Sequence, residues 1–181
     1  MQSQLTYGVG ASQGWWNGRP DGRVTSEPQY VEFHPDRVDD VVAAMEAIGV
    51  AGKGWVNFEP AVDADDIPAE SGTFSLFSGR GPAVPLATWT PGSTTRRGRV
   101  EPAMLGLQHP AGSRAKPLLT ERAHPVPQGW IVVQDHVRKG LVVSVPAAVT
   151  PAESLDWLLQ AAKLLSTIPL TGRWRAALYH G

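Results

Sequence analysis

The chain contains no cysteine among its 181 residues. This absence excludes disulfide scaffolds, thiol nucleophiles and metal centres held by thiolates. Charged residues are also sparse, at 18% of the chain, and the formal net charge is −1. So small a net charge produces no long-range field that attracts nucleic acid or an anionic membrane surface. We therefore expect no nucleic-acid partner.

Long hydrophobic runs are missing as well. No apolar stretch approaches the roughly 20 residues that a membrane-spanning helix needs, and the residues after Met1 lack the basic and apolar regions of a secretory signal. We expect a cytoplasmic protein without a membrane segment. Arginine outnumbers lysine twelve to four, a bias that favours a bacterial genome of high GC content.

The clearest folding signals lie in the last fifty residues. Two β-rich runs, 129–134 and 140–145, flank a polar turn and predict a hairpin. Residues 151–165 follow as an amphipathic helix, because Thr150 and Glu153 have the spacing of a capping box and proline occupies the first helical position. Residues 173–179 then predict a closing strand.

A similar strand, helix and strand pattern opens the more regular part of the chain. Residues 30–33 predict a strand, and a helix is expected to begin at Pro35 or Asp36 with apolar residues at spacings of three and four. Gly49 is expected to end this helix in a left-handed conformation, and a strand resumes at 55–58.

The remaining segments carry weaker signals. Residues 73–77, 84–89 and 99–107 predict strands separated by glycine and proline, residues 1–29 an irregular and partly packed segment, and residues 109–127 a long surface loop. The length suits one domain over 1–181. We predict an α+β two-layer sandwich: a mostly antiparallel sheet of about six to eight strands with two helices on one face. A β-α-β unit at each end suggests an elaborated ferredoxin-like order.

Motifs of catalysis and cofactor binding are weak. The segment 10–14 matches the G-x-S-x-G pattern of a nucleophile elbow, but neither a buried strand nor a helix flanks it. The five histidines show no metal-ligand spacing, and neither a Walker motif nor a dinucleotide-binding glycine pattern follows a strand. We expect no metal, no cofactor and no catalytic residue, and the chain favours a protein that is not an enzyme.

Two groups of polar residues are candidate ligand-binding sites. Asp135 and His136 close the first strand of the predicted hairpin, although neighbours on a strand point to opposite faces and so do not bond each other easily. Arg96, Arg97 and Arg99 surround a glycine in a predicted turn, where guanidinium groups can bind phosphate. For both groups the simpler interpretation is a solvated loop.

Seven tryptophans are many for a domain of this size. Trp15, Trp16 and Trp89 occur among glycines and prolines. They are candidates for an exposed interface, for stacking on a small ligand, or for plain packing. Our leading functional hypothesis is a non-catalytic protein that acts through protein–protein contacts, as a homodimer or with another protein. The alternative is a small-molecule-binding protein or hydrolase, with a site formed by His136, Arg97 and the 109–127 loop.

Overall fold

The structure, a computed structural model, describes residues 5–7, 27–67 and 81–181. The helices are α1 (Asp39–Ala51), α2 (Ala115–Glu121) and α3 (Pro151–Leu165), with a turn of 3-10 helix, η1 (Ala64–Asp66). The strands are β1 (Leu5–Tyr7), β2 (Gln29–Phe33), β3 (Trp55–Asp63), β4 (Leu86–Thr90), β5 (Ser93–Thr94), β6 (Val100–Glu101), β7 (Ala103–Gln108), β8 (Ile131–His136), β9 (Gly140–Val145) and β10 (Trp174–Tyr179).

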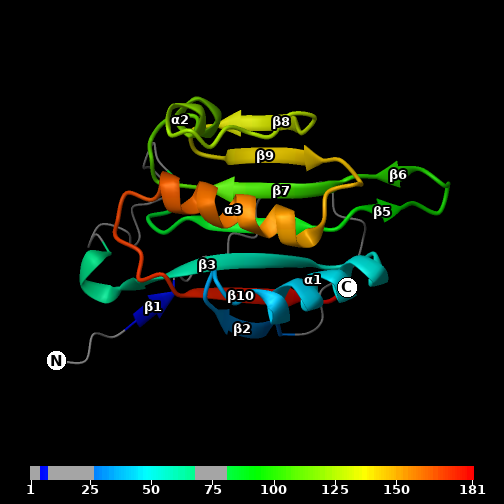
Figure 1. The fold of residues 1–181 in the computed structure, drawn as a ribbon, viewed down its shortest axis with the longest axis horizontal. Helices are drawn as coiled ribbons and strands as arrows, with labels where there is room; N and C mark the ends of the chain where they lie inside the picture. Colours follow the sequence, from blue (N-terminus) through cyan, green and yellow to red (C-terminus); the bar gives the residue numbers. More distant parts are fainter. Residues whose placement is uncertain (1–4, 8–26, 68–80) are drawn as a thin grey trace.

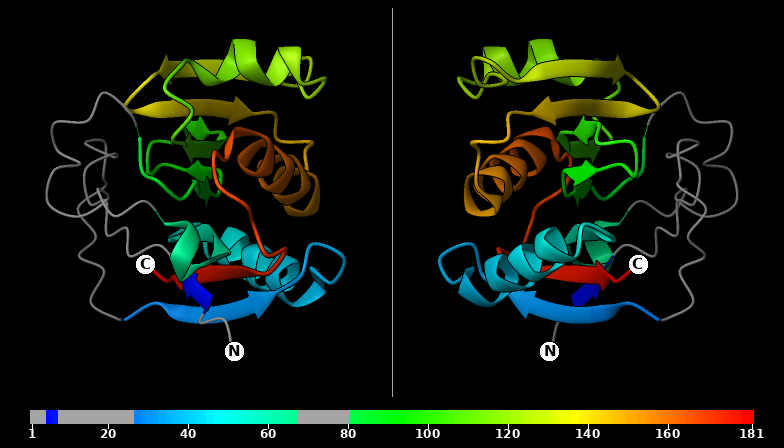
Figure 2. Two further views of the ribbon diagram at one scale, coloured as in Figure 1. Left: turned by 90° about the vertical axis from the view of Figure 1, so that its left-hand side faces the viewer. Right: turned by 90° about the vertical axis from the view of Figure 1, so that its right-hand side faces the viewer.

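In the described part of the chain, eight strands form one antiparallel sheet in the order β2-β10-β3-β4-β7-β9-β8, with β1 paired to β3 off this path. Strands β5 and β6 pair separately as a short hairpin between β4 and β7. The three helices lie on the same side of the large sheet, with α3 between α1 and α2 (Figures 1 and 2). The predicted α+β two-layer sandwich is confirmed.

The core lies between these two layers. Alternate residues of each strand face the helices, because successive side chains on a strand point to opposite faces. Val56 and Phe58 on β3 and Leu105 and Leu107 on β7 are buried in this way. From the helix side, α3 contributes a stripe of buried residues: Leu155, Leu158, Leu159, Ala162 and Leu165.

The ferredoxin-like order is not confirmed, although a β-α-β unit is present at each end of the chain. In the first unit, β2 and β3 are parallel and β10 lies between them, antiparallel to both. In the second unit, β9 and β10 are separated by β7, β4 and β3. The last strand thus inserts between the two strands of the first β-α-β unit, where a ferredoxin-like sheet would keep it outside them.

Helix α1 begins and ends at other residues than the sequence predicts. It begins at Asp39, since residues 34–37 form a turn in which the Arg37 amide donates to the His34 carbonyl at 2.9 Å. It ends at Ala51, and Gly52 takes the left-handed conformation with φ 63°. Gly49 lies inside the helix, so the prediction that it ends the helix is wrong. Gly52 is the glycine whose amide bonds to the last turn, at Ile48 and Gly49.

The C-terminal elements agree well with the sequence. The β8–β9 hairpin and β10 lie within two residues of their predicted ranges, and α3 spans the predicted 151–165. The capping box is formed: the Glu153 amide donates to Thr150 Oγ1 at 3.2 Å, and the Thr150 amide donates to Glu153 Oε2 at 2.7 Å. The third helix, α2, was not predicted.

The central segments are partly corrected. The predicted strand at 84–89 is β4, and the one at 99–107 is divided by Pro102 into β6 and β7. The prediction that 109–127 is only a surface loop is wrong, because α2 lies within it and buries Ala115 and Leu119 against the core. The predicted strand at 73–77 lies outside the described residues.

Candidate functional site

Asp135 and His136 have structural partners at one end of the sheet. The Asp135 carboxylate accepts hydrogen bonds from the Ala115 amide at 2.9 Å and the Lys116 amide at 3.3 Å, and so binds the first turn of α2. His136 Nδ1 accepts from the amides of Arg138 and Lys139 in the hairpin turn. The predicted separation of the two side chains is therefore observed, and each is bonded to a different segment of backbone.

The arginine loop lies at the other end of the sheet. Arg96, Arg97 and Arg99 belong to the β5–β6 hairpin, which precedes the start of β7. The start of β7 pairs with Val145, whereas its end pairs with Leu141, next to Gly140, the partner of His136 at the end of β8. The whole length of β7 separates the two groups, as Figure 1 shows. The predicted site formed by Arg97, His136 and the 109–127 loop is therefore wrong.

Of the three tryptophans proposed for an interface, Trp89 is only 3% exposed and packs in the core. It is buried because its position on β4 faces the helices, with Trp89 beside Val56 of β3. The prediction that Trp89 is an exposed contact is wrong. Trp15 and Trp16 lie outside the described residues.

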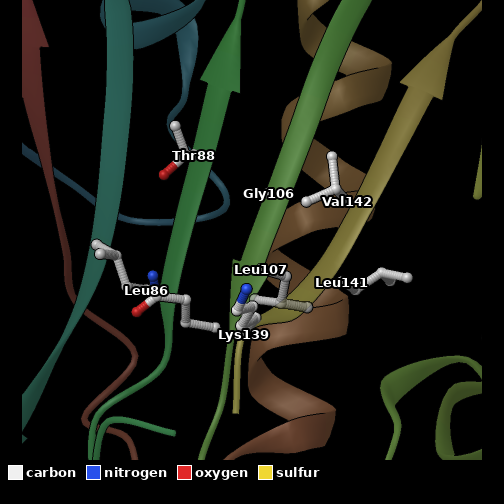
Figure 3. Close-up of a pocket in the computed structure, with 8 residues that line it drawn as sticks. Leu86, Thr88, Gly106, Leu107, Lys139, Leu141 and Val142 are labelled. Atoms are coloured by element: carbon white, nitrogen blue, oxygen red, sulfur yellow. The ribbon is translucent and has the colours of Figure 1, made fainter. Parts of the chain in front are cut away.

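None of the three described helices covers the other face of the sheet, which we call the helix-free face. It has a shallow hollow over β4, β7 and β9 (Figure 3). Gly106 lies at its centre and pairs with Thr88 of β4 on one side and with Val142 of β9 on the other. Because glycine has no side chain, the space between Thr88 and Val142 is left open. The hollow has a volume of about 20 Å³, which suits one water molecule. An organic ligand needs several hundred Å³.

A group of polar and aromatic side chains that the sequence analysis missed lies on the same face, over β2, β10, β3 and β4. We call it the polar face cluster, and its members are Tyr30, Trp55, Asn57, Glu59, Thr88, Arg175 and Tyr179. These residues alternate with the helix-facing residues of their strands, so the sequence pattern places them on the outer face. The pattern does not show that β10 lies between β2 and β3, and only that order brings the residues together.

The contacts within the cluster are well formed. Arg175 Nη2 lies 2.8 Å from Glu59 Oε2, and the Arg175 guanidinium lies 4.8 Å from the centre of the Tyr30 ring. Trp55 and Tyr179 stack with ring centroids 4.6 Å apart and an interplanar angle of 11°. Thr88 Oγ1 completes the group by donating to Asn57 Oδ1 at 2.9 Å.

The electrostatics of the cluster follow from its partial burial. Burial raises the pKa of the Glu59 carboxyl, and the hydrogen bond and charge of Arg175 oppose that rise. Burial also raises the pKa of the Tyr179 hydroxyl, assisted by Tyr30 and Glu59 and opposed by a hydrogen bond from Asn57. The charged groups in the cluster therefore depend on each other, and the ion pair with Arg175 offsets part of the effect of burial on the Glu59 carboxyl.

At the outer edge of this face, the cluster continues into a second ion pair. Arg173 Nη2 lies 2.7 Å from Glu32 Oε2, and both side chains are about half exposed. Tyr30, on the same edge strand, is 56% exposed. The cluster thus extends from half-buried groups on β3 to open side chains on β2.

Within the described ranges, no group of three or more histidine, aspartate or glutamate side chains has the arrangement of a metal site. No helix in that part of the chain is long and apolar enough to cross a membrane. Comparison with protein-family models, with curated proteins and with solved structures gives no match. The function has to be argued from the residues of this chain.

His109 is a buried polar residue, and the sequence analysis did not identify it as a candidate either. It is fully buried directly after β7, and its Nδ1 accepts from the Ala111 amide at 3.3 Å. Its Nε2 has no hydrogen-bond partner among the residues that the structure describes. A neutral ring with an unprotonated Nδ1 fits this contact. Burial lowers the pKa of His109; the charge of Asp135 opposes that shift and the charge of Arg122 adds to it.

We expect stability to fall with acidification because of His109. With its folded pKa below the ordinary value of about 6.5, its contribution is complete above pH 6.5 and is lost as the pH falls toward the folded pKa, because only the unfolded chain binds the proton. The loss reaches about 1.4 kcal/mol per pH unit. Urea unfolding between pH 7.5 and 5 measures it.

The same measurement is made on two variants: His109→Leu, which removes the group in question, and His180→Ala, which is the control. His109→Leu should flatten the pH profile, and His180→Ala serves as the comparison because it removes an exposed histidine. A profile of His109→Leu that runs parallel to that of the parent protein would contradict the assignment.

Proposed function

We propose that the protein is non-catalytic and acts through protein–protein contacts, and that its first partner is a second copy bound at strand β2. The single observation that carries this proposal is that the polar face cluster reaches solvent at an edge strand. Among the described strands, β2 has a neighbour, β10, on one side only. An edge strand offers unpaired backbone groups to another strand.

The residue types at this edge support the proposal. Tyrosine, tryptophan and arginine are enriched in protein interfaces, and they carry much of the binding energy there. In this protein the side chains of Tyr30 and Arg175 are already positioned before a partner binds. The Arg175 guanidinium lies over the Tyr30 ring and is paired with Glu59. Since these side chains are already ordered, little rotamer entropy is left to lose on binding.

The sequence of β2 favours antiparallel pairing with a second copy. A two-fold axis beside Val31, the central residue of Gln29–Phe33, places Tyr30 opposite Glu32 of the second copy and Gln29 opposite Phe33. An axis beside Glu32 would set two carboxylates opposite each other, which is unfavourable. Two-fold pairing of this kind buries the same patch on both copies.

The cysteine-free, arginine-rich composition supports our placement of this protein in a bacterial cytoplasm. We prefer protein contact to the small-molecule alternative because the residues of that alternative lie at opposite ends of β7. The hollow on the helix-free face also has room for only one water molecule.

The test is the oligomeric state of the full chain, measured by sedimentation velocity from micromolar to submillimolar concentration. We expect a dimer in the parent and at least about tenfold weaker association in Tyr30→Glu, because two carboxylates then face each other twice across the axis. The double variant Tyr30→Glu with Glu32→Lys sets opposite charges across the axis and should restore the dimer.

The matched control is Val50→Glu, since Val50 is 92% exposed and belongs to α1 and not to the β2 edge. This variant adds the same charge and should dimerise like the parent. A parent that stays monomeric over the whole range would overturn the proposal, and so would a Tyr30→Glu variant that associates as the parent does.

A further inference from the structure

The β5–β6 hairpin is a second exposed feature, independent of the β2 edge. Its strands pair Ser93 with Glu101 and Thr94 with Val100, and it extends past the end of the large sheet (Figure 1). In its turn, the Thr95 amide donates to the Arg99 carbonyl and the Gly98 amide to the Thr95 carbonyl, each at 2.9 Å. Gly98 has φ 76°, which suits a three-residue turn with a glycine bulge.

The turn therefore has a defined backbone that presents Arg96, Arg97 and Arg99. A further bond fixes it: the Arg99 amide donates to Thr95 Oγ1 at 3.1 Å. All three arginines are exposed. Among the described residues, none of their guanidinium groups makes an ion pair or a side-chain hydrogen bond.

Other arginines of the structure are used differently. Arg173 and Arg175 pair with carboxylates, and the Arg122 guanidinium donates to the Leu164 carbonyl. The hairpin thus carries three arginines that make no ion pair within the described part of the chain and one carboxylate, Glu101 on β6, so positive charge predominates at its tip. Since the whole chain has a formal charge of −1 and these three contribute +3, the rest of the chain sums to −4.

This distribution of charge favours a short anionic ligand over a nucleic acid. Binding to a nucleic-acid backbone depends on many simultaneous phosphate contacts. The rest of this protein has a net charge of −4, so it would repel the phosphates that lie beyond the hairpin. A short anionic segment needs contact only at the tip. Guanidinium groups bind carboxylates in forked pairs, and Val100, 69% exposed on β6, offers an apolar contact beside them.

We propose that the tip of the β5–β6 hairpin, with Arg96, Arg97 and Arg99, is a docking site for an acidic peptide segment of a protein partner. The site is separate from the β2 edge, so the protein can bind a second copy and an acidic segment at the same time.

The test uses fluorescence anisotropy of a labelled polyglutamate peptide with the full chain, and a polyglutamine peptide for comparison. We expect polyglutamate alone to bind, with an affinity that falls as salt is raised. The double variant Arg96→Ala with Arg97→Ala should bind about tenfold more weakly. Both residues are exposed and unbonded through their side chains, so folding is unaffected.

The matched control is Arg114→Ala with Lys116→Ala, which removes two exposed positive charges at the start of α2 and should leave binding unchanged. Equal loss in both double variants would show attraction by general charge and overturn the proposal. So would the absence of polyglutamate binding to the parent, or tighter binding of an oligonucleotide of equal charge that is lost in the same hairpin variant.

Discussion

Replacing Gly140 by alanine should lower the free energy of unfolding by about 4 kcal/mol, a loss in the range that marks a severe structural defect. Gly140 begins β9 with φ 79°, a conformation that side chains other than glycine's rarely adopt. A Cβ atom added there would lie 2.2 Å from the Leu107 carbonyl oxygen. The β7–β9 pairing would have to move apart, and urea unfolding monitored by circular dichroism measures the cost.

Gly129→Ala is the matched control, because Gly129 has φ 87° and no atom within 4 Å of an added Cβ. It carries the conformational cost alone, about 1 kcal/mol. If both variants lose the same stability, the close approach of β9 to β7 contributes nothing and the explanation for Gly140 fails.

The second large effect is expected in the ion pair of the polar face cluster. The Arg175 and Glu59 side chains are only 25% and 13% exposed. Arg175→Met keeps the aliphatic length but leaves the Glu59 carboxylate poorly solvated and without its cation. We expect a loss of about 2–3 kcal/mol at pH 7, measured by urea unfolding.

The pH dependence of this variant gives a second readout. Without Arg175, only burial acts on the pKa of Glu59, and the pKa rises further. A carboxyl with a raised folded pKa stabilises fully below its unfolded pKa, about 4.5, and loses that contribution as the pH rises through the folded value. The gap between the variant and the parent should therefore shrink as the pH falls from 7 toward 4.5.

Two further variants test the explanation. Arg173→Met breaks a pair of the same chemistry whose side chains are about half exposed, and it should cost less than about 1 kcal/mol. Adding Glu59→Gln to Arg175→Met should recover much of the lost stability, because no buried charge then remains. An equal loss for Arg173→Met and Arg175→Met would contradict the role of burial.

The sequence predicted the elements whose signals are local. The capping box at Thr150 and Glu153 begins α3 where its spacing indicates, and the β-rich runs around the hairpin turn form β8 and β9. Helix α2 was missed because its seven residues show too little periodicity to distinguish it from a loop. Its start depends on Asp135, twenty residues away, whose carboxylate binds its first amides.

For the candidate sites, too, the sequence predicts local features and does not show which distant residues come together. Alternation along β3 and β10 marks Glu59 and Arg175 as outward-facing residues, yet neither signals a site alone. Arg97 and His136 were assigned to one site because one lies in a predicted turn and the other directly before one, but β7 places them at opposite ends. Position in a turn says that a residue is near the surface, and it does not say which other turn lies beside it.

The sequence by itself determined the fold class, the two long helices, the hairpin and which residues of each strand share a face, since these depend on spacing within a few residues. The tertiary structure alone decided that β10 inserts between β2 and β3, that Trp89 is buried, and that Glu59 meets Arg175. The physical reason is that backbone hydrogen bonds between strands are the same for every sequence. The neighbour of a strand is therefore selected by packing across the whole core.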